Sequence, residues 1–128
     1  MRSFINDKAV GVQYWTGSVS TFVETNPSFR MFEVDEETMI PLKVRTYIFN
    51  MSDPNELKWR WDHELTEFYG MKDLSPRSFD DLNDRIRDHE EVALKYHRTY
   101  RNGGPMSAID KCDADCRKKM YCQQRNTV

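Results

Sequence analysis

The three cysteines of this 128-residue chain lie close together near its end, and their spacing permits several kinds of chemistry. Cys112, Cys116 and Cys122 all fall within the stretch CDADCRKKMYC. Residues four apart on a helix have α-carbons roughly 6 Å apart, so the first two cysteines can form a disulfide, whereas the third lies on a different face. A zinc site would need a fourth ligand, and no histidine follows His97. Three interpretations therefore stay open: a disulfide with one unpaired thiol, which we favour, a metal site, or three free thiols.

Histidines lie in stretches that could bind a metal or transfer a proton. Residues 61–64, WDHE, with Glu67 after them, approach the helical zinc motif H-E-x-x-H, but a glutamate takes the place of the second histidine. We therefore predict that His63 lies on the exposed face of a mixed-charge helix. His89 falls on a predicted apolar stripe, which indicates a partly buried histidine of the core. Because the histidines are spread over two predicted helices without a fixed spacing, the sequence predicts no metal site.

The composition argues against several classes of function. Hydrophobic residues make up 38% and aromatic residues 12%, which favours a folded chain of one-domain length. The formal charge of −2 gives no footprint for a nucleic-acid partner. No apolar run approaches the roughly 18 residues of a membrane span, and the first fifteen residues lack the pattern of a signal peptide. No G-x-S-x-G motif, P-loop or dinucleotide-binding turn occurs, so we expect neither nucleophilic nor nucleotide chemistry.

Runs of β-prone residues fill the first part of the chain. Alternation of apolar and polar residues from Ala9, and a second run at Val19–Val23, predict two short strands divided near Gly17. Two further runs, Phe29–Val34 and Leu42–Met51, are linked by the polar stretch DEETMIP and predict a hairpin. Four strands are therefore expected in this part.

Helix signals follow the strands. Ser52-Asp53-Pro54 predicts a helix start and Gly70 a helix stop, around an apolar stripe at steps of three and four. Ser75-Pro76 opens a second predicted helix, which Asn102-Gly103-Gly104-Pro105 ends. The stripe of the first helix is Leu57, Trp61, Leu65 and Phe68, and that of the second is Phe79, Leu82, Ile86, His89, Ala93, Tyr96 and Tyr100. The cysteine tail is expected to hold one or two helical turns.

This order of strands and then helices predicts an α+β fold. N-terminal β-strands with a hairpin would occupy residues 1–51, and residues 52–128 would form a helical subdomain whose tail carries the expected disulfide. Little in the sequence covers the β part, and an exposed sheet edge favours association. We therefore expect residues 1–51 to pack on another part of a larger protein.

The stretch NPSFRMFEVDEET, residues 26–38, resembles the segment that follows the metal site in acid sphingomyelinases and acid sphingomyelinase-like phosphodiesterases. The resemblance continues in the same order through GSVSTF (17–22), TYIFNMS (46–52), FYGMKDLSPRSFDDL (68–82), KYHRTYRNG (95–103) and the cysteine stretch. Members of this family are calcineurin-like metallophosphoesterases. The resemblance thus implies that residues 1–51 complete the sheet of a catalytic domain and that residues 52–128 are the C-terminal domain of such an enzyme.

The resemblance also implies a function for the full-length family. There, two zinc ions bound by D-x-H, G-N-H-E and G-H-x-H motifs support hydrolysis of a phosphodiester, such as sphingomyelin to ceramide and phosphocholine. None of these motifs occurs here, which implies no catalytic, cofactor-binding or metal-binding residue and an inactive isolated chain. A phospholipid substrate would be reached through the missing catalytic domain, and the full-length family is secreted or lysosomal. The alternative is a stand-alone, non-catalytic lipid- or protein-binding module derived from that family.

The resemblance also implies roles for individual residues. Phe22 matches a family tyrosine near the substrate cleft, without its hydroxyl group, and Arg30 matches the arginine of N-P-x-[YF]-R, which we interpret as structural. The pair Cys112 and Cys116 matches a family disulfide, whereas Cys122 matches a cysteine whose partner lies beyond position 128. Asn50, in the sequon Asn-Met-Ser, sits where the family often carries a glycan.

Overall fold

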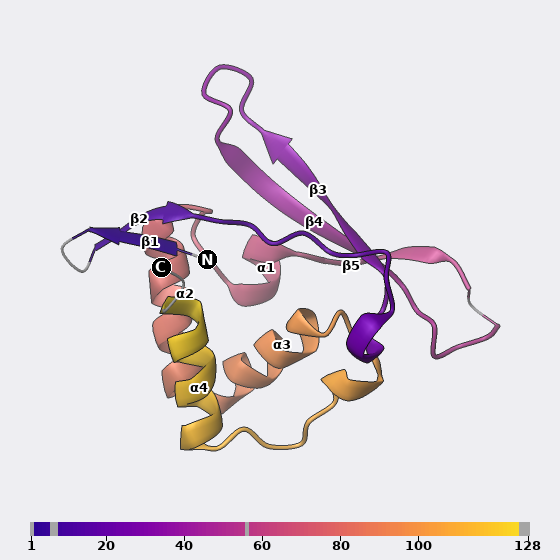
Figure 1. Cartoon of the computed structure of the whole chain (residues 1–128). Coiled ribbons are helices and arrows are strands. Elements are labelled where there is room, and N and C mark those ends of the chain that lie inside the picture. The colour runs from indigo at the N-terminus through magenta and orange to yellow at the C-terminus, as the bar shows by residue number, and fades with distance from the viewer. Residues whose placement is uncertain (1, 6–7, 56, 126–128) are drawn as a thin grey trace.

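The computed structural model describes residues 2–5, 8–55 and 57–125, and Figure 1 shows their α+β arrangement. The strands are β1 (Arg2–Ile5), β2 (Lys8–Val12), β3 (Ser28–Val34), β4 (Pro41–Phe49) and β5 (Trp59–Glu64). The helices are α1 (Leu65–Tyr69), α2 (Pro76–Asp88), α3 (Glu90–Tyr100) and α4 (Ala114–Arg125), with short 3-10 helices η1 (Phe22–Glu24) and η2 (Pro105–Ser107). The predicted fold class, strands followed by helices, is confirmed.

The main sheet is antiparallel, with the strand order β3-β4-β5, and β1 and β2 form a separate two-stranded sheet. The predicted hairpin is confirmed as β3 and β4, and it projects beyond the helices in Figure 1. Asp35 stabilises the turn between β3 and β4, because its carboxylate accepts hydrogen bonds from the Thr38 amide (2.8 Å) and hydroxyl (2.7 Å). Such a local side-chain bond favours a turn over continued strand pairing.

The two faces of this sheet differ. On one face Phe29 stacks on Tyr47 at 5.0 Å between ring centroids and meets Trp59 edge-on at 5.0 Å. Phe29 and Tyr47 are directly opposite each other on β3 and β4, a cross-strand pair that stabilises the register, and Trp59 lies on the third strand, β5. The other face buries Val44, Thr46 and Ile48 toward the helices. Since the aromatic face also exposes Met31 and Trp61, at 53% and 55%, it is a large apolar surface that no described residue covers.

The prediction of a helix from Ser52 to Gly70 is wrong over most of its length. Trp59–Glu64 form β5, in which Trp61 pairs with Tyr47 of β4. Of the predicted helical stripe only Trp61 falls in β5, where it shares one face with Trp59, and pairing with the edge of β4 decides between helix and strand. The helix proper is the short α1, and Gly70 ends it as predicted, with a φ of 59° that favours glycine.

The second predicted helix begins at Ser75 as expected but is two helices. The Ser75 hydroxyl accepts a hydrogen bond from the Ser78 amide at 3.3 Å, as an N-cap does. At His89 the backbone is extended, with φ −124° and ψ 117°, so α2 ends and α3 begins at a new angle. His89 is consequently exposed, and its prediction as a partly buried histidine is wrong. Asn102 and Gly103, both at positive φ, end α3 where predicted.

The predicted strand at Val19–Val23 is also wrong. Ser18 and Ser20 accept hydrogen bonds from backbone amides two residues ahead, those of Ser20 (3.0 Å) and Phe22 (3.1 Å). These local bonds compete with strand pairing, and the chain turns into η1 instead. Just before this turn Gly17 lies against β3, where a Cβ atom would come within 1.9 Å of the Ser28 hydroxyl. Only glycine lets the segment cross the sheet so closely.

The tail is longer and better packed than the predicted one or two turns. It forms the twelve-residue helix α4, which lies along α2 in Figure 1. The buried core lies among the helices and consists of Tyr69, Leu82, Ile86, Ala93, Cys112 and Met120. The sheet is therefore joined to a helical core that the tail completes.

Candidate functional site

A cavity of about 400 Å³ lies where the N-terminal segment, the main sheet and the helices meet. Residues from β2, β3, β5 and all four α-helices contribute to its wall. Its apolar part includes Phe79, Leu82 and Ile86 of α2, and its polar part includes Arg30 of β3 and Tyr69 of α1. Because so many elements meet here, the cavity exists only in the folded chain.

Arg30 is the charged group of this cavity. On β3 it shares a face with buried Ser28, and its Nη1 donates a hydrogen bond to the Trp15 carbonyl. Its Nε is buried without a hydrogen-bond partner, and no carboxylate among the described residues pairs with the guanidinium. Burial lowers the pKa of Arg30, an effect that Tyr69 and Tyr96 oppose. The cavity therefore holds a half-buried cation that no carboxylate of the described residues compensates.

Hydroxyl groups line the wall near Arg30. Thr99 donates its hydroxyl hydrogen to the Tyr96 carbonyl at 3.0 Å, so Tyr69, whose hydroxyl lies 2.5 Å from Thr99 Oγ1, is the donor in that second bond. Gln124 of α4 donates to the Tyr96 hydroxyl. Burial raises the pKa of Tyr69, so this phenol is neutral at ordinary pH. The polar wall thus offers neutral oxygen atoms and one positive charge.

An acidic residue and a histidine meet at the end of β5, beside this cavity. His63 Nδ1 lies 2.7 Å from the Asp62 carboxylate, which Arg98 of α3 contacts from the other side at 2.7 Å. His63 is only 3% exposed, so its prediction as a surface residue of a helix is wrong. It belongs to a strand, whose alternation turns it toward the helices.

The described residues do not fit a zinc pair. In the ranges 2–5, 8–55 and 57–125, no group of three or more His, Cys, Asp or Glu side chains lies close enough together to hold a metal ion. His63 lies on β5, exposed His89 between α2 and α3, and His97 on α3, where its Nδ1 lies 3.2 Å from the Ser107 carbonyl. Because they lie on separate elements, these histidines do not gather into one site.

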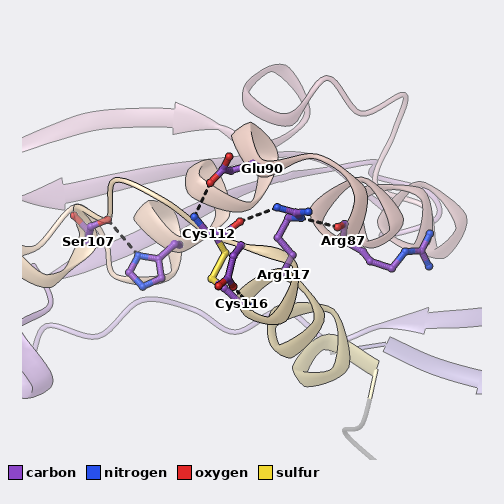
Figure 2. Close-up of a disulfide and its surroundings, with 8 residues drawn as sticks. Arg87, Glu90, Ser107, Cys112, Cys116 and Arg117 are labelled. Carbon is purple, nitrogen blue, oxygen red and sulfur yellow. Dashed lines mark hydrogen bonds between the residues drawn. A yellow bond between two sulfur atoms is a disulfide. The ribbon is translucent and has the colours of Figure 1, made fainter.

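The Cys112–Cys116 disulfide is confirmed, and Figure 2 shows how it is held. The Cys112 amide donates to the Glu90 carboxylate at 2.8 Å, at the start of α3. Arg117 donates to the carbonyls of Cys112 (2.8 Å) and Arg87 (2.9 Å), at the end of α2. These hydrogen bonds therefore hold the disulfide-bearing start of α4 against the break between α2 and α3.

The other positions singled out in the sequence lie apart from the cavity. Phe22 is 79% exposed on η1 and is not part of the cavity wall, so the structure does not bring it together with Arg30. Cys122 is a free, half-buried thiol on α4. Asn50 is half-buried at the end of β4, and its carboxamide oxygen accepts from the Ser52 amide at 3.1 Å. A cleft role for Phe22, a partner for Cys122 and a glycan on Asn50 stay predictions.

Most of the cavity wall was not predicted from the sequence. The alternation along β3 could have placed Arg30 on the same face as Ser28, and hence toward the interior. No local pattern connects Arg30 with Tyr69, Thr99 or Gln124, because these residues meet only through the tertiary fold. None of the helices in the described part of the chain has the length and apolar content needed to cross a membrane.

Comparison of the sequence with known proteins identifies the family of this chain. The sequence model of the acid sphingomyelin phosphodiesterase C-terminal region matches residues 4–126. Sphingomyelin phosphodiesterase B of Dictyostelium discoideum is 28% identical over 125 residues, covering 94% of this chain and 20% of the relative. Sphingomyelin phosphodiesterase 1 of Caenorhabditis elegans is 27% identical over 126 residues, covering 94% and 22%.

A third relative, named as an acid sphingomyelinase-like phosphodiesterase, has a similar identity and coverage. The human acid sphingomyelinase-like phosphodiesterase 3b is 29% identical over 120 residues, covering 90% of this chain and 26% of the relative. The chain thus spans between a fifth and about a quarter of the length of these relatives. Because the family match extends over nearly all of the sequence, the chain belongs to the family of acid sphingomyelin phosphodiesterase C-terminal regions.

Proposed function

We propose that this chain is the C-terminal part of a sphingomyelin phosphodiesterase-like enzyme and that it does not hydrolyse phosphodiesters by itself. The observation that carries the proposal is the family match over residues 4–126, together with relatives named as sphingomyelin phosphodiesterases. In the complete enzyme the reaction would be hydrolysis of a phosphodiester, as in the conversion of sphingomyelin to ceramide and phosphocholine. The phospholipid would be bound chiefly by a catalytic domain.

Zinc in such an enzyme would be bound outside this chain. The D-x-H, G-N-H-E and G-H-x-H motifs are absent from its sequence, and its described histidines lie on separate elements. When bound, the zinc pair would polarise the phosphoryl group and activate a water molecule. The residues described here would contribute by packing and positioning.

The exposed aromatic face of the main sheet supports a packing role. Phe29, Tyr47 and Trp59 lie side by side there, and Trp61 is 55% exposed. Apolar patches of this kind mark interfaces more often than free surface. We infer that residues 1–51 contact a catalytic domain through this face, to which Trp59 and Trp61 of β5 also contribute. A disulfide and a sequon at Asn50 suit the oxidising environment of a secreted or lysosomal protein.

A second candidate function is a stand-alone module that binds lipid or protein without catalysis. The observation in its favour is the cavity beside Arg30, because a concave, largely apolar wall with one charge is typical of a binding site. The two functions differ in one measurable respect. A module folds cooperatively alone, whereas a part of a larger enzyme needs its neighbour for full stability.

The test is to purify the 128-residue chain, dialyse it against zinc, and measure bound metal together with hydrolysis of bis(4-nitrophenyl) phosphate and of sphingomyelin. A full-length relative, assayed in parallel, shows that the conditions support turnover. We expect no stoichiometric zinc and no hydrolysis above buffer. Zinc bound at a fixed ratio together with turnover would overturn the proposal, and a single sharp thermal transition would favour the stand-alone module.

A further inference from the structure

We propose that the cavity beside Arg30 binds an amphipathic organic phosphate, with a phosphate oxygen on the guanidinium and an alkyl or aryl body against the apolar wall. This site requires neither zinc nor hydrolysis, and it gives a ligand class to the cavity on which the second candidate function rests. All residues that line the site belong to this chain, so the C-terminal region would bind this ligand without a catalytic domain.

The first step of the argument is charge. Arg30 lies in the cavity wall, its Nη1 is used by the Trp15 carbonyl, and its Nε is buried without a partner. Among the described residues no carboxylate pairs with it. A partly desolvated cation without a counter-ion is costly, and Arg30 is half-buried with its Nε atom shielded from water. An anion entering from outside would supply the missing interaction.

The second step is hydrogen-bond chemistry. Asn83 of α2 also lines the cavity and is only 2% exposed. Its Nδ2 donates to the Tyr121 carbonyl at 3.5 Å, which leaves the buried Oδ1 without a donor. Arg30 and Asn83, which both line the cavity, thus carry one unsatisfied donor and one unsatisfied acceptor. A phosphate monoester at mildly acidic pH carries both acceptor oxygens and a P–OH donor, whereas a carboxylate carries acceptors only.

The third step is size and polarity. The cavity of about 400 Å³ lies within the range of about 300–1,000 Å³ that small-molecule sites occupy. Phe79, Leu82 and Ile86 form one side of it, and the Tyr69 and Tyr96 hydroxyls interact with the Arg30 charge. Such a wall favours an apolar body over a second charge, so free inorganic phosphate would gain only part of the binding energy.

The experiment uses the full 128-residue chain and octyl phosphate below its critical micelle concentration. Binding is followed by calorimetry and by the Nε–Hε resonance of Arg30 in ¹H–¹⁵N spectra, identified by its loss in Arg30→Lys. We expect saturable binding at one site and a shift of this resonance. Inorganic phosphate should bind at least about tenfold more weakly, because it makes no apolar contact.

Two matched variants test whether Arg30 contributes to the binding of octyl phosphate. Arg30→Met should weaken octyl phosphate binding at least about tenfold, the effect of losing one charged hydrogen bond. Arg45→Met is the control, because Arg45 lies on the neighbouring strand, is bonded to Glu33 at 2.9 Å and faces solvent. Its affinity should equal that of the unchanged chain. If Arg30→Met does not fold, Arg30→Lys and the ligand series below decide.

The ligand series keeps the octyl body and changes the head group. Octyl glucoside and octyltrimethylammonium should not shift the Arg30 resonance, and octanoate should bind more weakly than octyl phosphate. Equal binding of the neutral or cationic amphiphile, or an unmoved Arg30 resonance, would overturn the proposal. Vesicles of phosphatidylcholine with and without phosphatidic acid distinguish a membrane lipid from a soluble ester. Binding to neither octyl phosphate nor phosphatidic acid vesicles would also overturn it.

Discussion

Asp62 connects β5 to α3, because its carboxylate is hydrogen-bonded on one side to His63 and on the other to Arg98. The two contacts are each 2.7 Å long, and the side chains of Asp62 and His63 are 9% and 4% exposed. Burial raises the pKa of Asp62, but the hydrogen bonds from His63 and Arg98 outweigh it and lower the pKa to about 2. This carboxylate therefore holds the sheet and the helical core together in its charged form.

The first prediction concerns acid stability. Because the pKa of Asp62 is lower in the folded chain than its ordinary value of 3.8, its ionised form stabilises the fold above about pH 4, and this stabilisation is lost as the pH falls toward 2. Each pKa unit corresponds to about 1.4 kcal/mol, so the contribution of this shift is about 2 to 3 kcal/mol. Urea unfolding of the chain and of Asp62→Asn should differ by this amount at pH 6 and converge near pH 2.

Asp110 provides the control for this comparison, since it is exposed in the loop before the disulfide. Asp110→Asn should follow the unchanged chain at every pH. A constant difference between Asp62→Asn and the unchanged chain from pH 6 to pH 2 would show that the Asp62 carboxylate is not the titrating group.

The second prediction concerns the disulfide. Closing the short loop between Cys112 and Cys116, which are four residues apart, restricts the unfolded chain and stabilises the fold by about 2 kcal/mol on a chain-entropy basis. Cys116→Ala should therefore lower the thermal midpoint, and dithiothreitol should lower the midpoint of the unchanged chain to a similar value. Cys122→Ala, which removes the free thiol, should keep the full response to dithiothreitol. An equal response in Cys116→Ala would contradict the assignment.

The fold was predictable from sequence where local chemistry decides it. The hairpin at β3 and β4, the N-cap at Ser75 and the helix stop at Gly70 all follow from side-chain and backbone preferences of neighbouring residues. The disulfide followed from the resemblance and is geometrically possible on its spacing alone. Each of these features requires only residues close together in the chain.

The rest depends on contacts between distant residues. Trp61 fits a helical stripe with Leu57 and Leu65 and also fits a strand, and only pairing with β4 selects the strand. His89 lies on a continuous apolar stripe, but the bond between Glu90 and the Cys112 amide favours a break between two helices there. The cavity beside Arg30 joins elements from β2 to α4, so no local pattern could have outlined it.

The third prediction concerns Glu64, which is 4% exposed at the junction of β5 and α1. Its carboxylate accepts hydrogen bonds from the amides of Thr66 (3.2 Å) and Glu67 (2.9 Å) and from the Val44 amide of β4 (3.3 Å). Glu64→Ala removes the cap of α1 and leaves a buried strand amide unsatisfied, so we expect a loss of about 2 kcal/mol in the free energy of unfolding. Denaturant unfolding measures it.

Glu67 is the matched control for this change, because it lies in the same helix with an exposed side chain. Glu67→Ala should change the free energy of unfolding by less than about 0.5 kcal/mol. Equal losses in the two variants would mean that charge near the helix start, and not the cap and the strand contact, determines the stability.

The fourth prediction concerns glycosylation at Asn50, which follows from its sequon and its place at the end of β4. The side chain is half-buried and turned into a local bond with the Ser52 amide, so it lies in a turn and not in the core. Secreted from eukaryotic cells behind an added signal peptide, the chain should carry one glycan, and peptide N-glycosidase F should remove it. Asn50→Gln should abolish that mass shift.

Asn26, in Asn-Pro-Ser, is the internal control, because it is 1% exposed and bonded to the Asn102 carbonyl and the Met51 amide. A glycan that persists in Asn50→Gln would show that this turn is not the acceptor.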